Sequence, residues 1–445
     1  MSSRPHHLRS TTAMNVTSGS DSRAPQRGVF SRPFCLFWLA SAISSLGDGI
    51  TRVALPVLAI VELHASDFEV SLIVAVSYAG VLVIGLPAGP LAQRFDLRRL
   101  QITLDSVRAA AVLTVPVGAA VGVLSIAQVL IVAFVVSLAT TLFDVANSAF
   151  IPTVVAPQNL LASNNALSGI FATSAFAGPA LGGVVVHFLG PANSMFADAL
   201  SYVASFLLLA GIARNPSGAA EPEICSGGQI RLSLRYITGH SIIRASVLAS
   251  SLVNFANGAL MAVIPTFLVR TLGLPPGTLG LVLATQGLGA LCAVLLLARV
   301  VRRAGDAPVL LWSVTATAFF AALLPMTVSS GALPVFLIAL AGAAAGVTAL
   351  SVITRTHRQL VTPPPLLAPV VATVRFITWA TLPLGALAGG IAGQTATPHA
   401  GLIVAAGAAF LAAVALWRSP VRSIRRLTDA KETSTGPPAT HETTH

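Results

Sequence analysis

The sequence predicts an all-α integral membrane protein with twelve membrane-spanning helices in two six-helix pseudo-repeats. Two observations predict this fold class. Of the 445 residues, 55% are hydrophobic and only 9% are charged, whereas soluble proteins are nearer 25% charged. Apolar stretches of about twenty residues also recur along the chain, and each is long enough to span a hydrocarbon core of roughly 30 Å.

The apolar stretches fall into two groups of six. The first group is expected at residues 35–61, 71–92, 102–123, 127–149, 166–189 and 193–213. The second group is expected at residues 246–270, 278–300, 308–328, 334–354, 367–394 and 398–417. Residues 214–244 form the one long polar break between the groups and contain Pro216, Gly218 and Pro222. We interpret this break as a linker.

Five parts follow from this organisation. We expect a disordered polar segment at 1–32, a first six-helix half at 33–213 and the linker at 214–244. A second half at 245–418 and a polar tail at 419–445 complete the chain. The first segment is rich in Ser, Thr and Arg and poor in aromatic residues, a composition typical of disorder.

Landmarks other than common apolar residues repeat between the halves. Sliding the chain by 209 residues places Asp48 on Asn257 and Pro56 on Pro265. A slide of 207 residues places Gly178 on Gly385. Two like-oriented halves of this kind predict a parallel repeat about an axis along the membrane normal, with a substrate path at the interface between them.

The net charge of +11 comes from arginines that lie between the apolar stretches rather than on one polar face. This distribution argues against a nucleic-acid partner and for the lipid bilayer. With twelve spans, every arginine-rich loop falls on one side of the membrane. The pattern predicts a multi-pass cell-membrane protein with both termini in the cytoplasm, and the Arg-dominated, Ala-rich composition indicates a bacterial source.

One loop carries a motif. Residues 89–99 read Gly-Pro-Leu-Ala-Gln-Arg-Phe-Asp-Leu-Arg-Arg, which resembles the loop signature of the major facilitator superfamily, although Gln93 replaces its acid and Leu97 an expected Arg. The resemblance implies a cytoplasmic gate that latches through contacts with acids and helix ends. Its residues would be Gly89, Arg94, Asp96, Arg98 and Arg99, with Asp144 as the partner of Arg94 or Arg98. The alternative is an arginine cluster that only sets topology.

Two further stretches resemble efflux proteins. Gly178, Pro179, Gly182 and Gly183 resemble the end of the helix-5 motif of drug/proton antiporters, although Asn165 and Ser174 stand where that motif has Gly. Residues 374–386 resemble helix 11 of a bacterial efflux branch that includes enterobactin and macrolide exporters. The glycines imply either a moving hinge or static close packing of helices.

Ionisable residues within the apolar stretches are candidates for a central site. A charge at the centre of a membrane helix costs roughly 2.5–3.5 kcal/mol and therefore needs a partner, water or a function. Asp48 and Arg52 have i, i+4 spacing and are expected to pair, with Asp48 as the proton carrier. Asp198 and Arg375 are weaker candidates: Asp198 could instead lie at the outer membrane interface, and Arg375 could contact an anionic substrate or Asp144. Asp105 and Arg108 are expected at the membrane interface.

The leading functional hypothesis is proton-coupled export of a small amphipathic drug, antibiotic or secondary metabolite by a monomeric alternating-access transporter. No phosphate-binding loop is present, since the only lysine, Lys431, has no such motif around it. No enzyme activity, cofactor or metal site is expected. Two alternatives stay open: uptake of a small nutrient by the same fold, and a non-transporting membrane receptor or partner subunit.

Overall fold

The computed structural model describes residues 31–156, 159–212, 227–327 and 330–427. Within these ranges, twelve helices are long and apolar enough to cross a membrane. The all-α fold class and the number of spans are thereby confirmed. Apart from their residues nearest the helices, the expected segment 1–32 and tail 419–445 lie outside the described residues.

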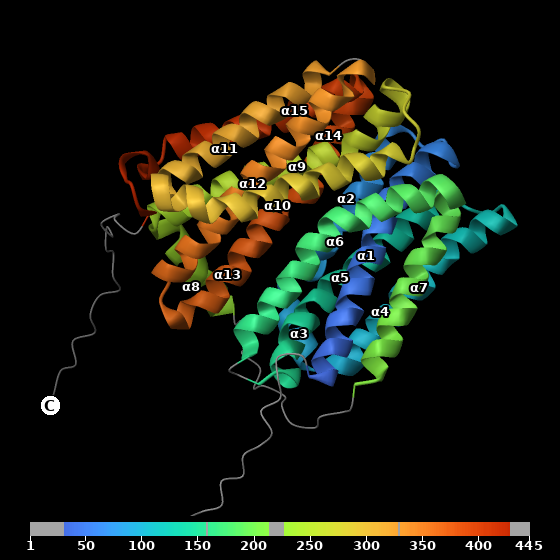
Figure 1. Cartoon of the computed structure of the whole chain (residues 1–445), viewed down its shortest axis with the longest axis horizontal. Helices are drawn as coiled ribbons and strands as arrows, with labels where there is room; N and C mark the ends of the chain where they lie inside the picture. Colours follow the sequence, from blue (N-terminus) through green and yellow to red (C-terminus); the bar gives the residue numbers. More distant parts are fainter. Residues whose placement is uncertain (1–30, 157–158, 213–226, 328–329, 428–445) are drawn as a thin grey trace, which may run out of the picture.

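The helices form two bodies (Figure 1). The N-terminal body, blue to green, contains α1 (Arg32–Val61), α2 (Asp67–Ile84), α3 (Ala88–Gln93), α4 (Leu97–Val121), α5 (Ile126–Val154), α6 (Leu160–Leu189) and α7 (Pro191–Ala210). The C-terminal body, yellow to red, contains α8 (Gly227–Gly239), α9 (Ser241–Thr266), η2 (Phe267–Thr271), α10 (Thr278–Ala304), α11 (Asp306–Leu323), α12 (Leu333–Val361), α13 (Pro364–Trp379), α14 (Thr381–Thr395) and α15 (Pro398–Trp417).

Prolines and short helices explain where the helices differ from the expected spans, although residues 365–395 still count as one membrane span. The span expected at 71–92 ends at Ile84, and the short helix α3 follows after Pro87. The span expected at 367–394 is divided at Ala380, because Pro383 has no N–H to bond the carbonyl four residues earlier. Helix α8 lies within the expected linker, whose residues 214–226 lie outside the described part.

The two bodies repeat the same packing. Helices α5 and α12 begin and end 207 residues apart, as do α7 and α15. A Cβ on Gly182 of α6 would lie 3.0 Å from the Cα of Ile50 in α1. A Cβ on Gly389 of α14 would lie 2.8 Å from the Cα of Ala259 in α9. Since Ile50 and Ala259 are equivalent under the slide of 209 residues, the α1–α6 contact recurs as α9–α14.

The contacts between the bodies obey the same equivalence. A Cβ on Gly280 of α10 would lie 2.4 Å from the Cα of Gly183 in α6, and one on Gly390 of α14 would lie 2.2 Å from the Cβ of Ser71 in α2. Ser71 and Gly280 are again equivalent under the slide of 209 residues. We call this region, at the start of α2 and of α10, the closed end.

An ion pair fastens the closed end. Arg270 of η2 donates hydrogen bonds to the Asp67 carboxylate and to the Ala65 carbonyl, which both belong to the N-terminal body. The side chain of Arg270 is 36% exposed and that of Asp67 is 20% exposed. Because one end of the molecule carries both the glycine contacts and this pair, a cavity can persist between the bodies elsewhere.

Candidate functional site

A central cavity of about 390 Å³ lies between the two bodies. Its walls come from α1, α2, α5, α6 and α7 on one side and from α9, α10 and α13 on the other. Most of its lining is apolar. The charged residues that line it are Asp48, Arg52, Asp144 and Arg375. The cavity therefore adjoins all but one of the residues expected to form the central site, the exception being Asp198.

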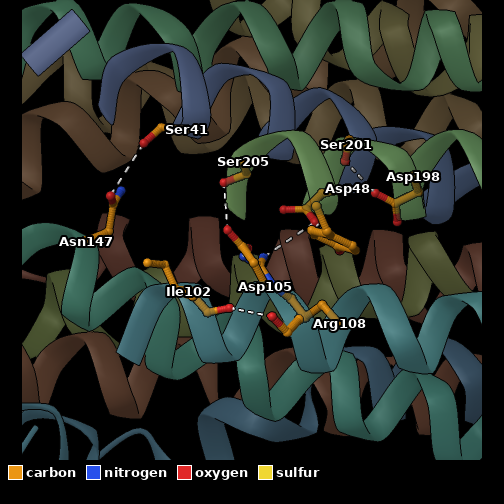
Figure 2. Close-up of polar contacts among 11 residues, drawn as sticks. Ser41, Asp48, Ile102, Asp105, Arg108, Asn147, Asp198, Ser201 and Ser205 are labelled. Carbon is orange, nitrogen blue, oxygen red and sulfur yellow. Dashed lines mark hydrogen bonds and ion pairs between the residues drawn. The ribbon is translucent and has the colours of Figure 1, made fainter. Parts of the chain in front are cut away.

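A group of polar side chains lies behind the cavity wall formed by Asp48 (Figure 2). Arg108 of α4 is at its centre, with a side chain only 1% exposed. Its guanidinium pairs with Asp105 one turn earlier and lies 3.9 Å from Asp48. The rings of Phe143 and Tyr202 cover it at 4.2 and 4.5 Å from their centroids. The buried arginine is thus compensated by two carboxylates and two aromatic faces.

Helix α7 supplies the other side of this group. The Tyr202 hydroxyl donates to Asp48 at 2.6 Å, and the Ser205 hydroxyl donates to Asp105 at 2.7 Å. Asp198 is fully buried and accepts hydrogen bonds from Thr51 and from Ser201, the latter at 3.1 Å. Asp198 lies three and four residues before Ser201 and Tyr202, and Ser205 lies four and three residues after them, so all four share one side of α7.

We call Asp48, Asp105, Arg108, Asp198 and Tyr202 the charge cluster. Figure 2 shows the labelled members of this set drawn together from α1, α4 and α7. Three of the members are carboxylic acids and only one is a guanidinium. The cluster reaches the central cavity through Asp48 and Tyr202, and the Asp48 side chain is 26% exposed.

Comparison with known proteins identifies the family. The family model described as transmembrane secretion effector matches residues 24–443, almost the whole chain. The chain belongs to this family. Its relatives are transporters of the major facilitator superfamily, and the chain has the fold of that superfamily. Both family and fold are those of transporters rather than enzymes.

Two bacterial relatives are also named as transport proteins. An uncharacterized MFS-type transporter, YfiS, of Bacillus subtilis is 26% identical over 259 residues, 57% of this chain and 60% of the relative. The multidrug efflux pump Tap of Mycolicibacterium fortuitum is 26% identical over 198 residues, 43% of this chain and 48% of the relative. The match therefore spans about half of each relative.

Solved structures confirm the fold. A bacterial homologue of the iron transporter ferroportin, in its inward-facing state, superposes with a TM-score of 0.72 at 16% identity, over 86% of this chain and 98% of that one. A point mutant of the nucleoside transporter NupG superposes with a TM-score of 0.73 at 11% identity, over 86% of this chain and 98% of that one. A bacterial ferroportin homologue in its outward-facing state superposes with a lower TM-score, 0.61.

The expected pair between Asp48 and Arg52 is wrong in this transporter. Asp48 contacts Arg108 and Tyr202 instead, and Arg52 is exposed in the central cavity. The physical reason is solvation, because Arg108 is closed off from water and needs the carboxylate, whereas Arg52 can be hydrated in the cavity.

The expected interfacial position of Asp105 and Arg108 is also wrong. Asp105 is fully buried and Arg108 nearly so. The sequence does contain a signal for them, since opposite charges at i, i+3 within an apolar helix share a face and can enter the bundle together as a pair. Asp198 is likewise buried rather than interfacial.

Of the partners expected for Asp144, the described residues bring Arg375 to it rather than an arginine of the gate loop. Asp144 lies 3.9 Å from Arg375 of the opposite body. Among the described residues it does not pair with Arg94 or Arg98. Arg98 instead donates to the carbonyls of Leu209 and Ala210 at the end of α7, at 2.9 and 2.5 Å. Arg98 thus makes the helix-end contact that the family resemblance implies.

The rest of the gate loop has local roles. Gly89 lies within α3, and Arg94 follows its last residue. The Asp96 carboxylate caps α4 by accepting from the N–H of Arg99 at 3.1 Å, and the Arg99 side chain is exposed. Capping of this kind fixes where α4 begins, and therefore where Arg108 lies along the bundle.

The glycine motif of α6 serves two contacts. Gly178 and Gly182 pack on α1, where a Cβ on Gly178 would lie 3.0 Å from the Cα of Gly49. Gly183 faces Gly280 of the C-terminal body, and the carbonyl of Pro179 approaches the same glycine. The motif therefore joins α1 to α6 within one body and closes the two bodies together.

Gly47 of α1 allows α1 and α7 to pack closely beside the charge cluster. We predict that Gly47→Ala disturbs this packing. The new Cβ would lie 1.9 Å from Ser201 Oγ and 2.4 Å from Asp198 Oδ1. Overpacking of this kind typically costs about 1–3 kcal/mol, so the purified protein should unfold at a lower temperature. Gly169→Ala is the matched control, because a Cβ there would meet nothing within 4 Å. Equal unfolding temperatures for the two variants would contradict the tight α1–α7 contact.

Proposed function

We propose that this chain is a proton-coupled exporter of small amphipathic compounds that works by alternating access. The observation that carries the proposal is the charge cluster, which is buried in one body and reaches a largely apolar cavity between two bodies. The named efflux pump among the relatives supports the direction of transport. The closed end and the better match to an inward-facing structure support a state open on the opposite side.

The cluster's charges suit proton binding. The cluster holds three carboxylic acids and one guanidinium: Asp48 and Asp105 lie beside Arg108, and Asp198 is buried nearby on α7. A further positive charge is therefore stabilised there. Asp48 is the carboxylic acid of the cluster that lines the cavity, and we assign it the exchange of protons with water. Asp198, held by Thr51 and Ser201, is its buried partner acid.

We also propose that both termini lie in the cytoplasm of a cell membrane. The arginine-rich loops then lie on the inner side, as the positive-inside rule requires. The closed end, with Asp67 and Arg270, then faces outward. The Asp144–Arg375 pair belongs to the inner part of the cavity, and we propose that it tightens when that side closes. Labelling of single introduced cysteines near each terminus in intact cells tests this orientation, and reaction from outside would contradict it.

Transport into inverted vesicles tests the function. When the membrane is energised, a panel of amphipathic dyes and antibiotics should contain at least one compound that the vesicles accumulate, and a protonophore should abolish the accumulation. A proton moving through ~100 mV gains about 2.3 kcal/mol, which supports a gradient of about fifty-fold for a neutral solute. We predict that Asp48→Asn reduces this gradient to none while the protein still inserts and exchanges solute passively.

Asp306→Asn is the matched control, since Asp306 does not line the central cavity and its carboxylate accepts a hydrogen bond from the backbone N–H of Leu427. Proton-driven accumulation that survives in Asp48→Asn would remove Asp48 from the coupling site. Accumulation by intact cells, rather than by inverted vesicles, would favour uptake over export.

A further inference from the structure

A second cavity, which we call the hollow, lies in the C-terminal body and has a volume of about 260 Å³. Its walls are apolar for the most part and come mainly from α9, α10, α11, α12 and α15, with four residues from α1, α2 and α6 of the N-terminal body. It adjoins the central cavity, because both are lined by Arg52, Tyr78, Ala175, Met261 and Leu283. A molecule in the central cavity can therefore extend into it.

The hollow occupies the place in the C-terminal body that the charge cluster occupies in the N-terminal body. The slide of 209 residues places Asp48 on Asn257 and Arg108 on Thr317. The slide of 207 residues places Asp198 on Ala405 and Tyr202 on Ala409. All four of these counterparts line the hollow.

The space exists because small residues replace large ones. Arginine, aspartate and tyrosine fill the first body at positions where the second has threonine and two alanines. The repeated helix packing holds the backbones in the same arrangement, so the missing side-chain volume is left as a cavity. The two bodies have thus diverged, one toward a filled ionic core and the other toward an open apolar pocket.

Arg52 is the charged group at the mouth of the hollow. The other charged residues that line either cavity each have an opposite partner, Asp48 with Arg108 and Asp144 with Arg375. In the described ranges, no ion pair or hydrogen bond joins Arg52 to another residue, and its side chain is exposed. An unpaired guanidinium beside an apolar pocket is a site for a carboxylate or another anionic group.

Two amides add polar contacts deeper in the pocket. Asn257 and Gln286 line the hollow, and within the described part of the chain neither makes a hydrogen bond. The threonines of the hollow, by contrast, donate to their own helices, as Thr317 does to the Ser313 carbonyl at 2.9 Å. A few free polar groups in an apolar wall are typical of small-molecule sites.

We propose that the hollow takes the apolar body of an acid-bearing amphipathic substrate, whose anionic group binds Arg52. This inference rests on the proposed function for its role in transport, although binding can be measured separately. It narrows the substrate class from amphipathic compounds in general to those that carry a carboxylate or a similar anion.

Three matched fluorescent probes test the proposal. Dansyl-aminohexanoate carries a carboxylate, dansyl-cadaverine carries an ammonium group on a similar chain, and dansyl-lysine carries both. Their binding to the full chain in lipid nanodiscs can be followed by energy transfer from Trp379, which lines the central cavity. We expect both acid-bearing probes to bind at least about tenfold more tightly than dansyl-cadaverine, as a charge-assisted hydrogen bond allows.

Variants separate the two parts of the site. Arg52→Gln should abolish the preference for the acids, Arg52→Lys should keep most of it, and Arg52→Glu should reverse it toward dansyl-cadaverine. Ala409→Phe should weaken all three probes by filling the hollow. Gly407→Phe on the outer face of the same helix is its control, because a Cβ there meets nothing within 4 Å. Arg299→Gln, an arginine of α10 outside both cavities, is the control for Arg52.

Each outcome decides the proposal. A wild-type protein that binds the three probes equally, or binds none, overturns it. An acid preference that persists in Arg52→Gln, or binding unaffected by Ala409→Phe, also overturns it. Energised inverted vesicles distinguish it from the proposed function. If the probes bind with the expected preference but are never accumulated, the proposed export is contradicted and the proposed anion site is not. If acid and cation probes are accumulated equally, the proposed anion site is contradicted and the proposed export is not.

Discussion

Replacing Arg108 with methionine is expected to lower the free energy of unfolding by about 3–5 kcal/mol, the usual result of removing one partner from a buried ion pair. Arg108 is 1% exposed and its partner Asp105 is fully buried. Methionine fills a similar length of chain, but it leaves the Asp105 carboxylate without a cation. The measurement is thermal or denaturant unfolding of the purified protein in detergent, followed by circular dichroism.

A double variant isolates the electrostatic part of this effect. Asp105→Asn removes the second charge while the amide can still accept from Ser205, which now donates to Asp105 at 2.7 Å. We therefore expect Arg108→Met combined with Asp105→Asn to be more stable than Arg108→Met alone, so that the two changes are strongly non-additive. If the two changes in the free energy of unfolding simply add, or if Arg108→Met is as stable as the unsubstituted protein, then water reaches the charge cluster and the cluster is not a buried ionic core.

The second large effect is expected at the closed end. Gly280→Val would place its Cβ 2.4 Å from the Cα of Gly183 and 2.5 Å from the Pro179 carbonyl oxygen. Both neighbours are backbone atoms of the opposite body, so the strain is relieved only if the bodies separate there. An overpacking cost of about 1–3 kcal/mol would shift the equilibrium away from this closed state by about 5- to 150-fold.

Spin labels can measure that shift. One label at Val123, after α4, and another at Val335, near the start of α12, are both on exposed positions in different bodies. In a background without native cysteines, electron–electron resonance should report a longer distance in Gly280→Val than in the unsubstituted protein. Gly169→Val, on the open face of α6, should leave the distance distribution unchanged. The same distribution in both variants would show that the glycine contact does not hold this end closed.

Much of the site could be located from the sequence, but the partner of Asp48 could not. Asp48, Arg52, Asp144 and Arg375 do line one cavity. The i, i+4 spacing of Asp48 and Arg52 allows a pair but does not require one, because each side chain can also reach another helix. The choice depends on Arg108, which approaches Asp48 only after α4 and α7 have packed on α1.

The difference between the two bodies, an ionic cluster in one and a cavity in the other, also depends on packing. The sequence shows that Asp48 aligns with Asn257, yet it does not show whether alanine and threonine at the other equivalent positions leave a void or allow the helices to close in. The structure shows that the glycine contacts keep equivalent helices equally spaced, so the void remains.

The membrane, the number of spans, the family resemblance and the internal repeat could all be predicted from the order of residues alone. They depend on the composition and length of local segments and on residues a fixed number of positions apart. Helix packing in three dimensions was needed to establish that Arg108 is buried, that Asp144 meets Arg375 rather than Arg94 or Arg98, and that Arg52 lines both cavities. The reason is that the state of a charge in a membrane bundle depends on which helices surround it, and those helices are distant from it along the chain.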